Sequence, residues 1–231
     1  MAERTPDLEK TSADATPVPD DSRASQLVQR LLAVGIDGKG PFDSAAEVAR
    51  AARAEHPTTE SAVHAVVRSQ TRLAAANGFA TGVGGLLTLA VSLPANVLGF
   101  YVLATRTVAA VAELRGYDST RPEVRSAVLL TLVGTDATDV LKSVGLPSLP
   151  SVRGHVAKLF TKRLPPSVLM LVNKGVGFRL LARFGATGLL RLPTRSLPLV
   201  GGVVGAGMDA MTFRRIAKQA EVAFPPRGAE D

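Results

Sequence analysis

Apolar residues recur every three or four positions along most of the chain, which is the spacing of helices that bury one face. This spacing predicts helices over residues 25–36, 44–55, 59–77, 120–142, 152–162, 165–184 and 198–224. Two helix starts carry the spacing of a capping box, Ser44 with Glu47 and Thr120 with Glu123. Because Ala, Leu and Val dominate and aromatic residues are few, the pattern predicts an all-α fold, a multi-helix bundle.

The pattern also indicates how the helices end and how the chain is divided. Gly116 is expected to end a helix in the left-handed conformation, and Gly134 to break the 120–142 helix. One helical domain is expected over residues 25–224. The polar residues 1–24 are predicted to form a disordered acidic tail without a secretory signal, and residues 225–231 a frayed C-terminal tail.

The longest apolar stretch, Leu73 to Thr105, contains 33 residues without a charged side chain. It predicts a helical hairpin with arms over 78–93 and 95–115 and a corner at Leu93-Pro94, because proline suits the first turn of a helix. Its length would suffice to span a bilayer. Its glycines and Arg106 oppose a span, so a hairpin buried in a helical core is favoured, with shallow membrane insertion as a further alternative.

Small residues recur along this hairpin and again near the start of the 198–224 helix. Such stripes let two helix backbones approach closely, so the two glycine-rich helices are expected to pack on each other. The predicted helix-contact glycines are Gly82, Gly85, Gly99, Gly201 and Gly205.

Positive charge is concentrated in the C-terminal half. The chain has a formal net charge of +7, and no acidic residue lies between Asp139 and Asp209. Like charges recur there at a spacing of four residues, which is unfavourable in an isolated helix and indicates an anionic partner. The predicted anion-contacting residues are Lys158, Lys162, Arg179, Arg183, Arg214 and Lys218.

Catalytic and metal-binding motifs are missing from the sequence. The chain has no Cys, and its three histidines do not have a metal-binding spacing, so no metal and no cofactor is expected. His64 is expected to be a half-buried structural residue. Base-stacking aromatic residues are few and no DNA- or RNA-binding motif is present, so nucleic acid is not expected either. No catalytic residue is predicted, which favours a non-enzymatic protein.

Two blocks of the sequence resemble the EcsC family. They are TGVGGLLTLAVSLPANVLGFYVLATRTVAAVAELRGYD at 81–118 and SLPLVGGVVGAGMDAMTFRRIAKQA at 196–220, and the resemblance covers roughly residues 60–224. It implies a helical bacterial protein, and some family members are encoded beside ABC-transporter components.

Two positions depart from the family pattern, which has Asp in place of Asn96 and Asn in place of Asp209. This exchange suggests that the two side chains meet in the core. Because a buried carboxylate needs partners, Arg106 is predicted to complete a buried cluster of Asn96, Arg106 and Asp209. The cluster would either fix the packing of two helices or form a polar site that binds a ligand.

The resulting expectation is a cytoplasmic protein that lies peripherally on the inner face of the cell membrane. Its partner would be an anionic membrane surface or a membrane protein complex such as an ABC transporter. One alternative is a soluble ligand-binding protein or enzyme with a buried site at Asn96, Arg106 and Asp209. Another is a basic interaction module for an acidic protein.

Overall fold

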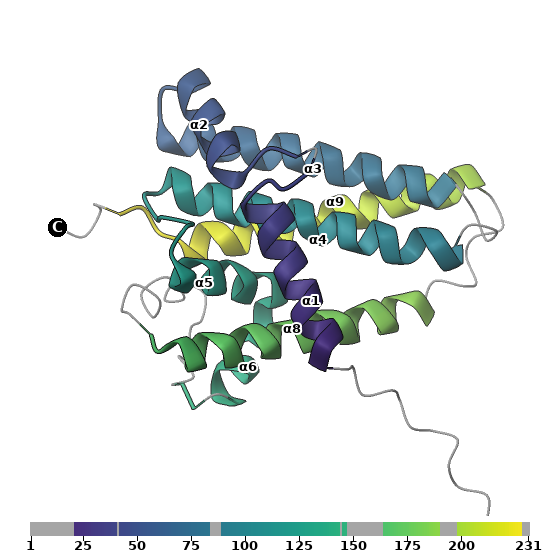
Figure 1. Ribbon diagram of the computed structural model, residues 1–231. Helices are drawn as coiled ribbons and strands as arrows, with labels where there is room; N and C mark the ends of the chain where they lie inside the picture. The colour runs from purple at the N-terminus through teal and green to yellow at the C-terminus, as the bar shows by residue number, and fades with distance from the viewer. Residues whose placement is uncertain are drawn as a thin grey trace, which may run out of the picture.

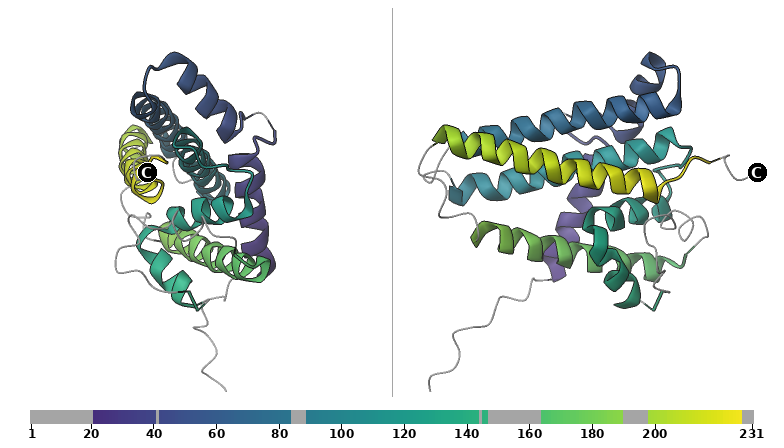
Figure 2. Two further views of the ribbon diagram at one scale, coloured as in Figure 1. Left: turned by 90° about the vertical axis from the view of Figure 1, so that its left-hand side faces the viewer. Right: turned by 180° about the vertical axis from the view of Figure 1, so that it is seen from behind.

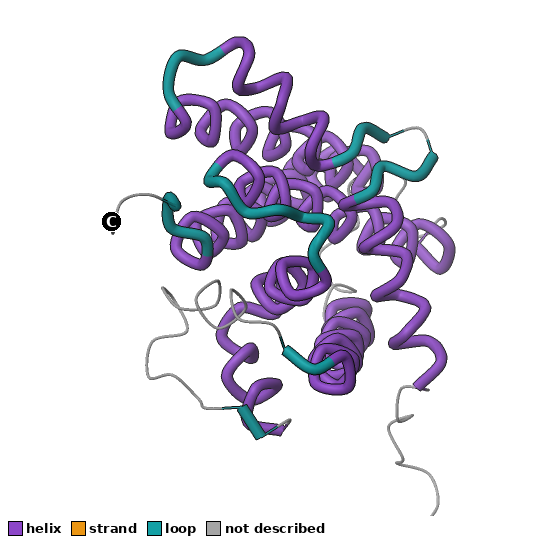
Figure 3. The backbone as a smooth tube through the Cα atoms, turned by 60° about the vertical axis from the view of Figure 1, so that its left-hand side comes forward, coloured by secondary structure: helices purple, strands orange, loops and turns teal. Residues whose placement is uncertain are grey.

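The computed structural model describes residues 21–40, 42–83, 89–143, 145–146, 164–189 and 198–227. Within these residues the regular structure is helical throughout, which confirms the all-α fold (Figure 3). The helices are α1 (Asp21–Arg30), the π-helix η1 (Leu31–Ile36), α2 (Ala45–Glu55), α3 (Thr59–Val83), α4 (Leu89–Leu114), α5 (Pro122–Val133), the 3-10 helix η3 (Gly134–Asp136), α6 (Ala137–Ser143), α8 (Pro166–Leu189) and α9 (Pro198–Ala223).

Helix α4 lies at the centre of the bundle. It contacts α2, α3, α5, α9 and η1 (Figure 1). Helix α9 packs along α3 on one side of the bundle. Helix α1 crosses the opposite side of the bundle and contacts α8 (Figure 2). Helix α3 runs antiparallel to both α4 and α9, so α4 and α9 point in the same direction (Figure 2).

The central position of α4 explains its apolar sequence. Its segment Val97–Leu114 is long and apolar enough to cross a membrane, but 72% of that segment is buried inside the protein. Val108 and Val111 are completely buried, as are most of their neighbours on this helix. Burying such residues against other helices supplies the main driving force for folding.

The predicted corner of the hairpin at Leu93-Pro94 is wrong. Helix α3 continues through Gly78 to Val83, and α4 already begins at Leu89. Leu93 and Pro94 therefore lie within the first two turns of α4, and residues 84–88 lie outside the described residues. A proline near the start of a helix removes only one backbone hydrogen bond, so α4 accommodates Pro94.

The capping predictions have two outcomes. Ser44 and Glu47 form the predicted capping box, with the Glu47 amide donating to Ser44 Oγ over 3.2 Å. The box at Thr120 is wrong, because α5 begins with Arg121 as its N-cap and Pro122 at its first position. The Thr120 hydroxyl instead donates to Asp118 over 2.6 Å.

The predicted glycine signals are confirmed. Gly116 follows α4 with φ 86°, and Gly134 separates α5 from α6 with φ 61°. Both angles lie in the left-handed region, where a side chain is strained.

The N-terminal prediction needs correction, because Asp21 to Ala24 belong to α1 rather than to a disordered tail. Ala24 is completely buried, and its carbonyl oxygen lies 2.7 Å from where a Cβ on Gly177 would be. Residues 1–20 and the predicted helix over 152–162 lie outside the described residues.

Three glycines outside the predicted set allow close helix contact. Gly35 faces Thr105, Gly175 faces Val140 and Gly177 faces Ala24, each leaving too little space for a Cβ. Of the predicted glycines, Gly99 faces the Asn77 amide at an ordinary 3.6 Å. Gly82 lies on α3, Gly201 and Gly205 lie on α9, and Gly85 lies outside the described residues. The two helices with glycine stretches, α3 and α9, do pack on each other.

Candidate functional site

A basic groove lies between α3 and α9. On α3, His64, Arg68 and Arg72 follow one another at intervals of four residues, so they occupy one face of the helix. On α9, Arg214 and Lys218 have the same interval. All five side chains are exposed. The hollow between the helices has a volume of about 540 Å³ and is lined by His64, Val67, Arg68, Thr71, Arg72, Ala75, Ala210 and Arg214.

The groove continues toward the start of α3. A second hollow of about 520 Å³ is lined by His56, Ser61, His64, Ala65 and Arg68. It shares His64 and Arg68 with the first hollow, so the two form one continuous surface along α3. We call the surface formed by His64, Arg68, Arg72, Arg214 and Lys218 the basic groove.

The cations of the basic groove differ from others in the protein by their lack of acidic partners. Elsewhere, Arg125 pairs with Asp37 at 2.7 Å, Arg115 with Glu60 at 3.0 Å, and Lys174 with Asp21. Across the described part of the chain, no carboxylate lies within ion-pair distance of the four Lys and Arg side chains of the groove. Like charges at this spacing repel one another, so a bound anion would stabilise them.

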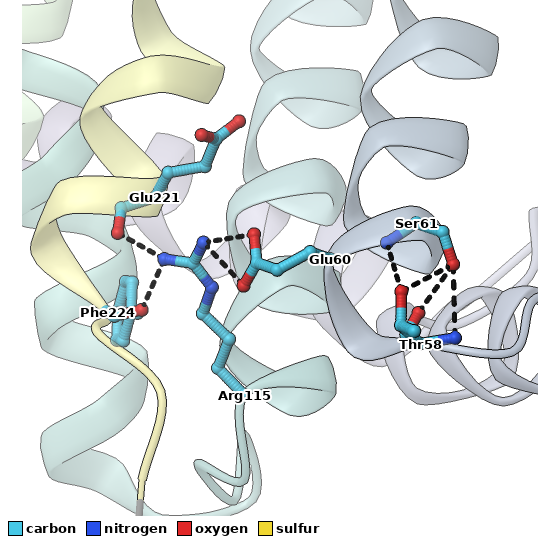
Figure 4. A network of polar contacts seen from close by, with 6 residues as sticks. All are labelled: Thr58, Glu60, Ser61, Arg115, Glu221 and Phe224. Carbon is cyan, nitrogen blue, oxygen red and sulfur yellow. Dashed lines mark hydrogen bonds and ion pairs between the residues drawn. The ribbon is translucent and has the colours of Figure 1, made fainter. Parts of the chain in front are cut away.

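A polar network fixes α3, α4 and α9 together at one end of the groove (Figure 4). The Arg115 side chain at the end of α4 is 7% exposed and donates to both carboxylate oxygens of Glu60 on α3, at 3.0 and 3.1 Å. It also donates to the carbonyls of Glu221 and of Phe224, the latter at 2.9 Å. A guanidinium has five donors in a fixed plane, which suits it to connect three helices at once.

Arg106 lies deeper in the bundle and joins α4 to the segment before α2. Its guanidinium donates to Gln70 Oε1 over 3.3 Å and to the carbonyl of Asp43 over 3.5 Å. It also lies 5.2 Å from the centre of the Phe42 ring, a distance typical of a cation–π contact. Burial lowers the pKa of Arg106, and the negative charge of Asp43 opposes this effect. None of these three partners is among the residues that line the basic groove, and Arg106 does not line it either.

For the predicted cluster of Asn96, Arg106 and Asp209, helix register places two of the three positions relative to each other. Asp209 is 7% exposed and lies one turn before Phe213, whose ring contacts Phe100 at 5.9 Å. Asn96 lies one turn before Phe100, and α4 and α9 run in the same direction. Positions 96 and 209 are therefore at the same level of the bundle.

Arg106 lies ten residues beyond Asn96, which is about 15 Å along the helix axis. Its described contacts go to Gln70, Asp43 and Phe42. The side chain of Asn96 lies outside the described part, so the Asn96–Asp209 contact stays a prediction.

The predicted anion-contacting residues are distributed over different surfaces. Arg214 lines the hollow of the basic groove, and exposed Lys218 lies one turn farther along α9. Arg179 on α8 instead forms ion pairs with two acids. It lies 3.5 Å from Asp139 on α6 and 3.9 Å from Asp136 on η3. Lys158, Lys162 and the side chain of Arg183 lie outside the described residues.

Sequence reasoning missed the α3 side of the groove. His64 is exposed, so its interpretation as a half-buried residue is wrong. Its spacing to Arg68 and Arg72 was visible in the sequence, but that sequence alone does not show that α9 brings Arg214 beside them.

The family comparison covers both helices of the groove. The model of the EcsC protein family matches residues 43–227. This chain belongs to the EcsC protein family. The match begins before α2 and ends after α9, so it is longer than the resemblance at roughly 60–224. Comparisons with curated proteins and with solved structures find no match.

Proposed function

We propose that this EcsC family protein is a non-enzymatic protein that binds the surface of anionic membranes through the basic groove. The observation that carries the proposal is the gathering of four exposed basic side chains around one hollow between α3 and α9, with exposed Lys218 one turn farther along α9. The four are His64, Arg68, Arg72 and Arg214. Arginine pairs with phosphate oxygens in a bidentate geometry, and each Lys or Arg near an anionic membrane contributes about 1 kcal/mol.

The chemistry of the groove favours lipid phosphates over nucleic acid. The described residues that line it include no Phe or Tyr, and the chain contains no Trp. Proteins that bind single-stranded nucleic acid stack bases on such rings. Phosphate groups on a lipid surface require only the cations.

The location that fits this activity is the cytoplasmic face of the cell membrane, where anionic lipids attract basic segments. A protein held there would also be close to membrane protein complexes. An adaptor role toward an ABC transporter fits the resemblance to the EcsC family, and it is part of the same proposal.

The alternative, a soluble ligand-binding protein or enzyme with a site at Asn96, Arg106 and Asp209, has less support. Arg106 is held by Gln70, Asp43 and Phe42, and the two described hollows are not lined by Arg106 or Asp209.

Vesicle flotation of the full chain tests the proposal. The protein should float with vesicles that contain phosphatidylglycerol, should stay behind with pure phosphatidylcholine, and should be released by high salt. The combined variant Arg68→Gln, Arg72→Gln and Arg214→Gln should bind the anionic vesicles at least about tenfold more weakly.

A matched control separates the groove from the total charge. Arg23, Arg30 and Arg50 are exposed and lie on α1 and α2, so their combined change to Gln removes the same charge elsewhere. This control should retain most of the binding. Equal losses in both triple variants would show that net charge rather than the groove determines binding, and the proposal would be rejected.

A further inference from the structure

The surface that carries the basic groove becomes apolar toward one end of the bundle. On α3, the face that carries Arg68 continues to Ala75 and Phe79, which follow at intervals of seven and eleven residues. On α9, the face that carries Arg214 leads back to Gly207 and Val203 at the same two intervals. Because α3 and α9 are antiparallel, the apolar ends of both faces coincide (Figure 2). Phe79 is 43% exposed and Val203 is 66% exposed.

The same end of the bundle lacks charge in all four of its long helices. The end of α3, the start of α4, the end of α8 and the start of α9 lie together there (Figure 1). We call these segments the charge-free end; they are residues 73–83, 89–105, 184–189 and 198–208, and none of them contains Asp, Glu, Lys or Arg. Eleven residues of α3 or α9 correspond to about 16 Å along the helix.

Several large apolar side chains of the charge-free end face the outside. They are Leu73, Phe79, Val203 and Met208. Gly207 has no neighbouring atom within 4 Å of where a Cβ would be, so the α9 surface is open at this position between Val203 and Arg214. An apolar surface bordered by cations is typical of a membrane interface.

We propose that the charge-free end enters the interface of an anionic bilayer while the basic groove lies at the level of the phosphates. This inference rests on the proposed function and adds the orientation of the bundle. Arg72 and Phe79 are seven residues apart, or about 10 Å along α3, which matches the 5–10 Å depth of interfacial helices.

The charge pattern favours a bilayer over a soluble phosphate as the partner of this surface. No described carboxylate lies within ion-pair distance of the four Lys and Arg side chains of the groove, and exposed Phe79, Met211 and Val203 lie farther along the same two helices. A lipid layer presents anionic groups above an apolar region in the same order. A soluble phosphate would engage only the cations.

Site-specific fluorescence measures this orientation directly, since the chain has no Cys and single cysteines can be labelled cleanly. An environment-sensitive NBD label is placed at Val203→Cys and, separately, at Phe79→Cys. Val222→Cys is the matched control, because Val222 is exposed near the other end of α9, about 28 Å farther along the helix. Met170→Cys reports on the exposed start of α8.

With phosphatidylglycerol vesicles, labels at positions 203 and 79 should shift to the blue, gain intensity several-fold and be quenched by spin-labelled lipids. Labels at 222 and 170 should change little. Glycerol phosphate in solution should leave the emission at 203 unchanged. An equal change with glycerol phosphate would overturn membrane entry.

The remaining outcomes separate the two proposals. Binding to the vesicles without a change at 203 and 79 overturns the orientation and leaves the proposed function intact. A change at 170 or 222 in place of 203 shows that another face enters and also overturns the orientation. A lack of binding to anionic vesicles overturns both. As an unlabelled check, Val203→Asp should weaken vesicle binding about tenfold, whereas Val222→Asp should not.

Discussion

Arg115 and Glu60 form an ion pair of 3.0 Å in which the two partners have unequal exposure. The arginine side chain is 7% exposed, and the glutamate side chain is 51% exposed. Glu60 stands at the second position of α3, where a carboxylate also suits the positive end of the helix dipole. Arg115 additionally donates to two carbonyls at the end of α9. The arginine is therefore the structural centre of this contact, and the glutamate is one of its several partners.

Replacing Arg115 should destabilise the protein much more than replacing Glu60. Arg115→Met leaves the carbonyls of Glu221 and Phe224 without their donor, which should cost about 2–4 kcal/mol in the free energy of unfolding. Glu60→Gln removes one partly exposed ion pair, worth about 1 kcal/mol or less. Urea unfolding followed by circular dichroism measures both values. Equal values for the two variants would contradict the central role of Arg115.

Glycine substitutions on α8 and α9 should have opposite effects on stability. A Cβ at Gly177 would lie 2.7 Å from the backbone oxygen of Ala24, so Gly177→Ala must push α8 away from α1. We expect a loss of about 1–3 kcal/mol. At Gly207 no atom lies within 4 Å, so Gly207→Ala should stabilise α9 by about 0.5–1 kcal/mol. Thermal unfolding compares the two, and stabilisation by Gly177→Ala would contradict the described packing of α1 on α8.

Local sequence signals predicted much of the helical framework. The capping box at Ser44 fixes the start of α2, and prolines mark the starts of α8 and α9. Such signals act through neighbouring residues, so a single sequence contains them. The prediction of the hairpin corner was wrong because it took Pro94 to mark the first turn of a new helix. Pro94 lies in the second turn of α4, where a proline removes one backbone hydrogen bond and leaves the rest of the helix in place.

The basic groove could be predicted only in part, since its two sides come from distant parts of the chain. Arg214 and Lys218 were identified from the excess of charge in the C-terminal half. Arg68 and Arg72 became relevant only when α9 packed against α3. Tertiary structure also explains why Arg179 is not a free cation, because Asp136 and Asp139 approach it from η3 and α6.

The ion pair of Asp37 with Arg125 should make stability depend on acidic pH. Both terminal guanidinium nitrogens of Arg125 donate to the carboxylate over 2.7 Å, and these hydrogen bonds lower the pKa of Asp37. A lowered folded-state pKa stabilises the protein above the unfolded value of about 3.9. That contribution disappears as the pH falls through the folded-state pKa.

Asp37→Asn should therefore reduce the melting temperature slightly at neutral pH, by the equivalent of about 1 kcal/mol or less because the pair is partly exposed. The difference from the unmodified protein should shrink as the pH falls below the unfolded value of about 3.9 and through the lowered folded-state pKa of that carboxylate. Arg125→Gln should reduce the same pH dependence. A difference that grows on acidification would show that the sign of the effect is wrong.

The level shared by positions 96 and 209 makes the predicted Asn96–Asp209 contact testable by exchange. If the two side chains meet, Asn96→Asp places two carboxylates together in the buried region around Asp209, and their repulsion should destabilise the protein by about 1–3 kcal/mol. Asp209→Asn removes the charge and should have a smaller effect. The double variant restores one acid and one amide in the arrangement usual for the family, so it should recover most of the lost stability.

A double-mutant cycle from urea unfolding measures this coupling, which should be about 1 kcal/mol or more in favour of the double variant. Asn77→Asp combined with Asp209→Asn is the control, because Asn77 lies on α3 opposite Gly99 rather than on α4. If the effects of the Asn96 and Asp209 changes are simply additive, the side chains do not interact, and the exchange of Asp and Asn relative to the family has another origin. A coupling confined to the 96–209 pair would identify the contact that aligns α4 with α9.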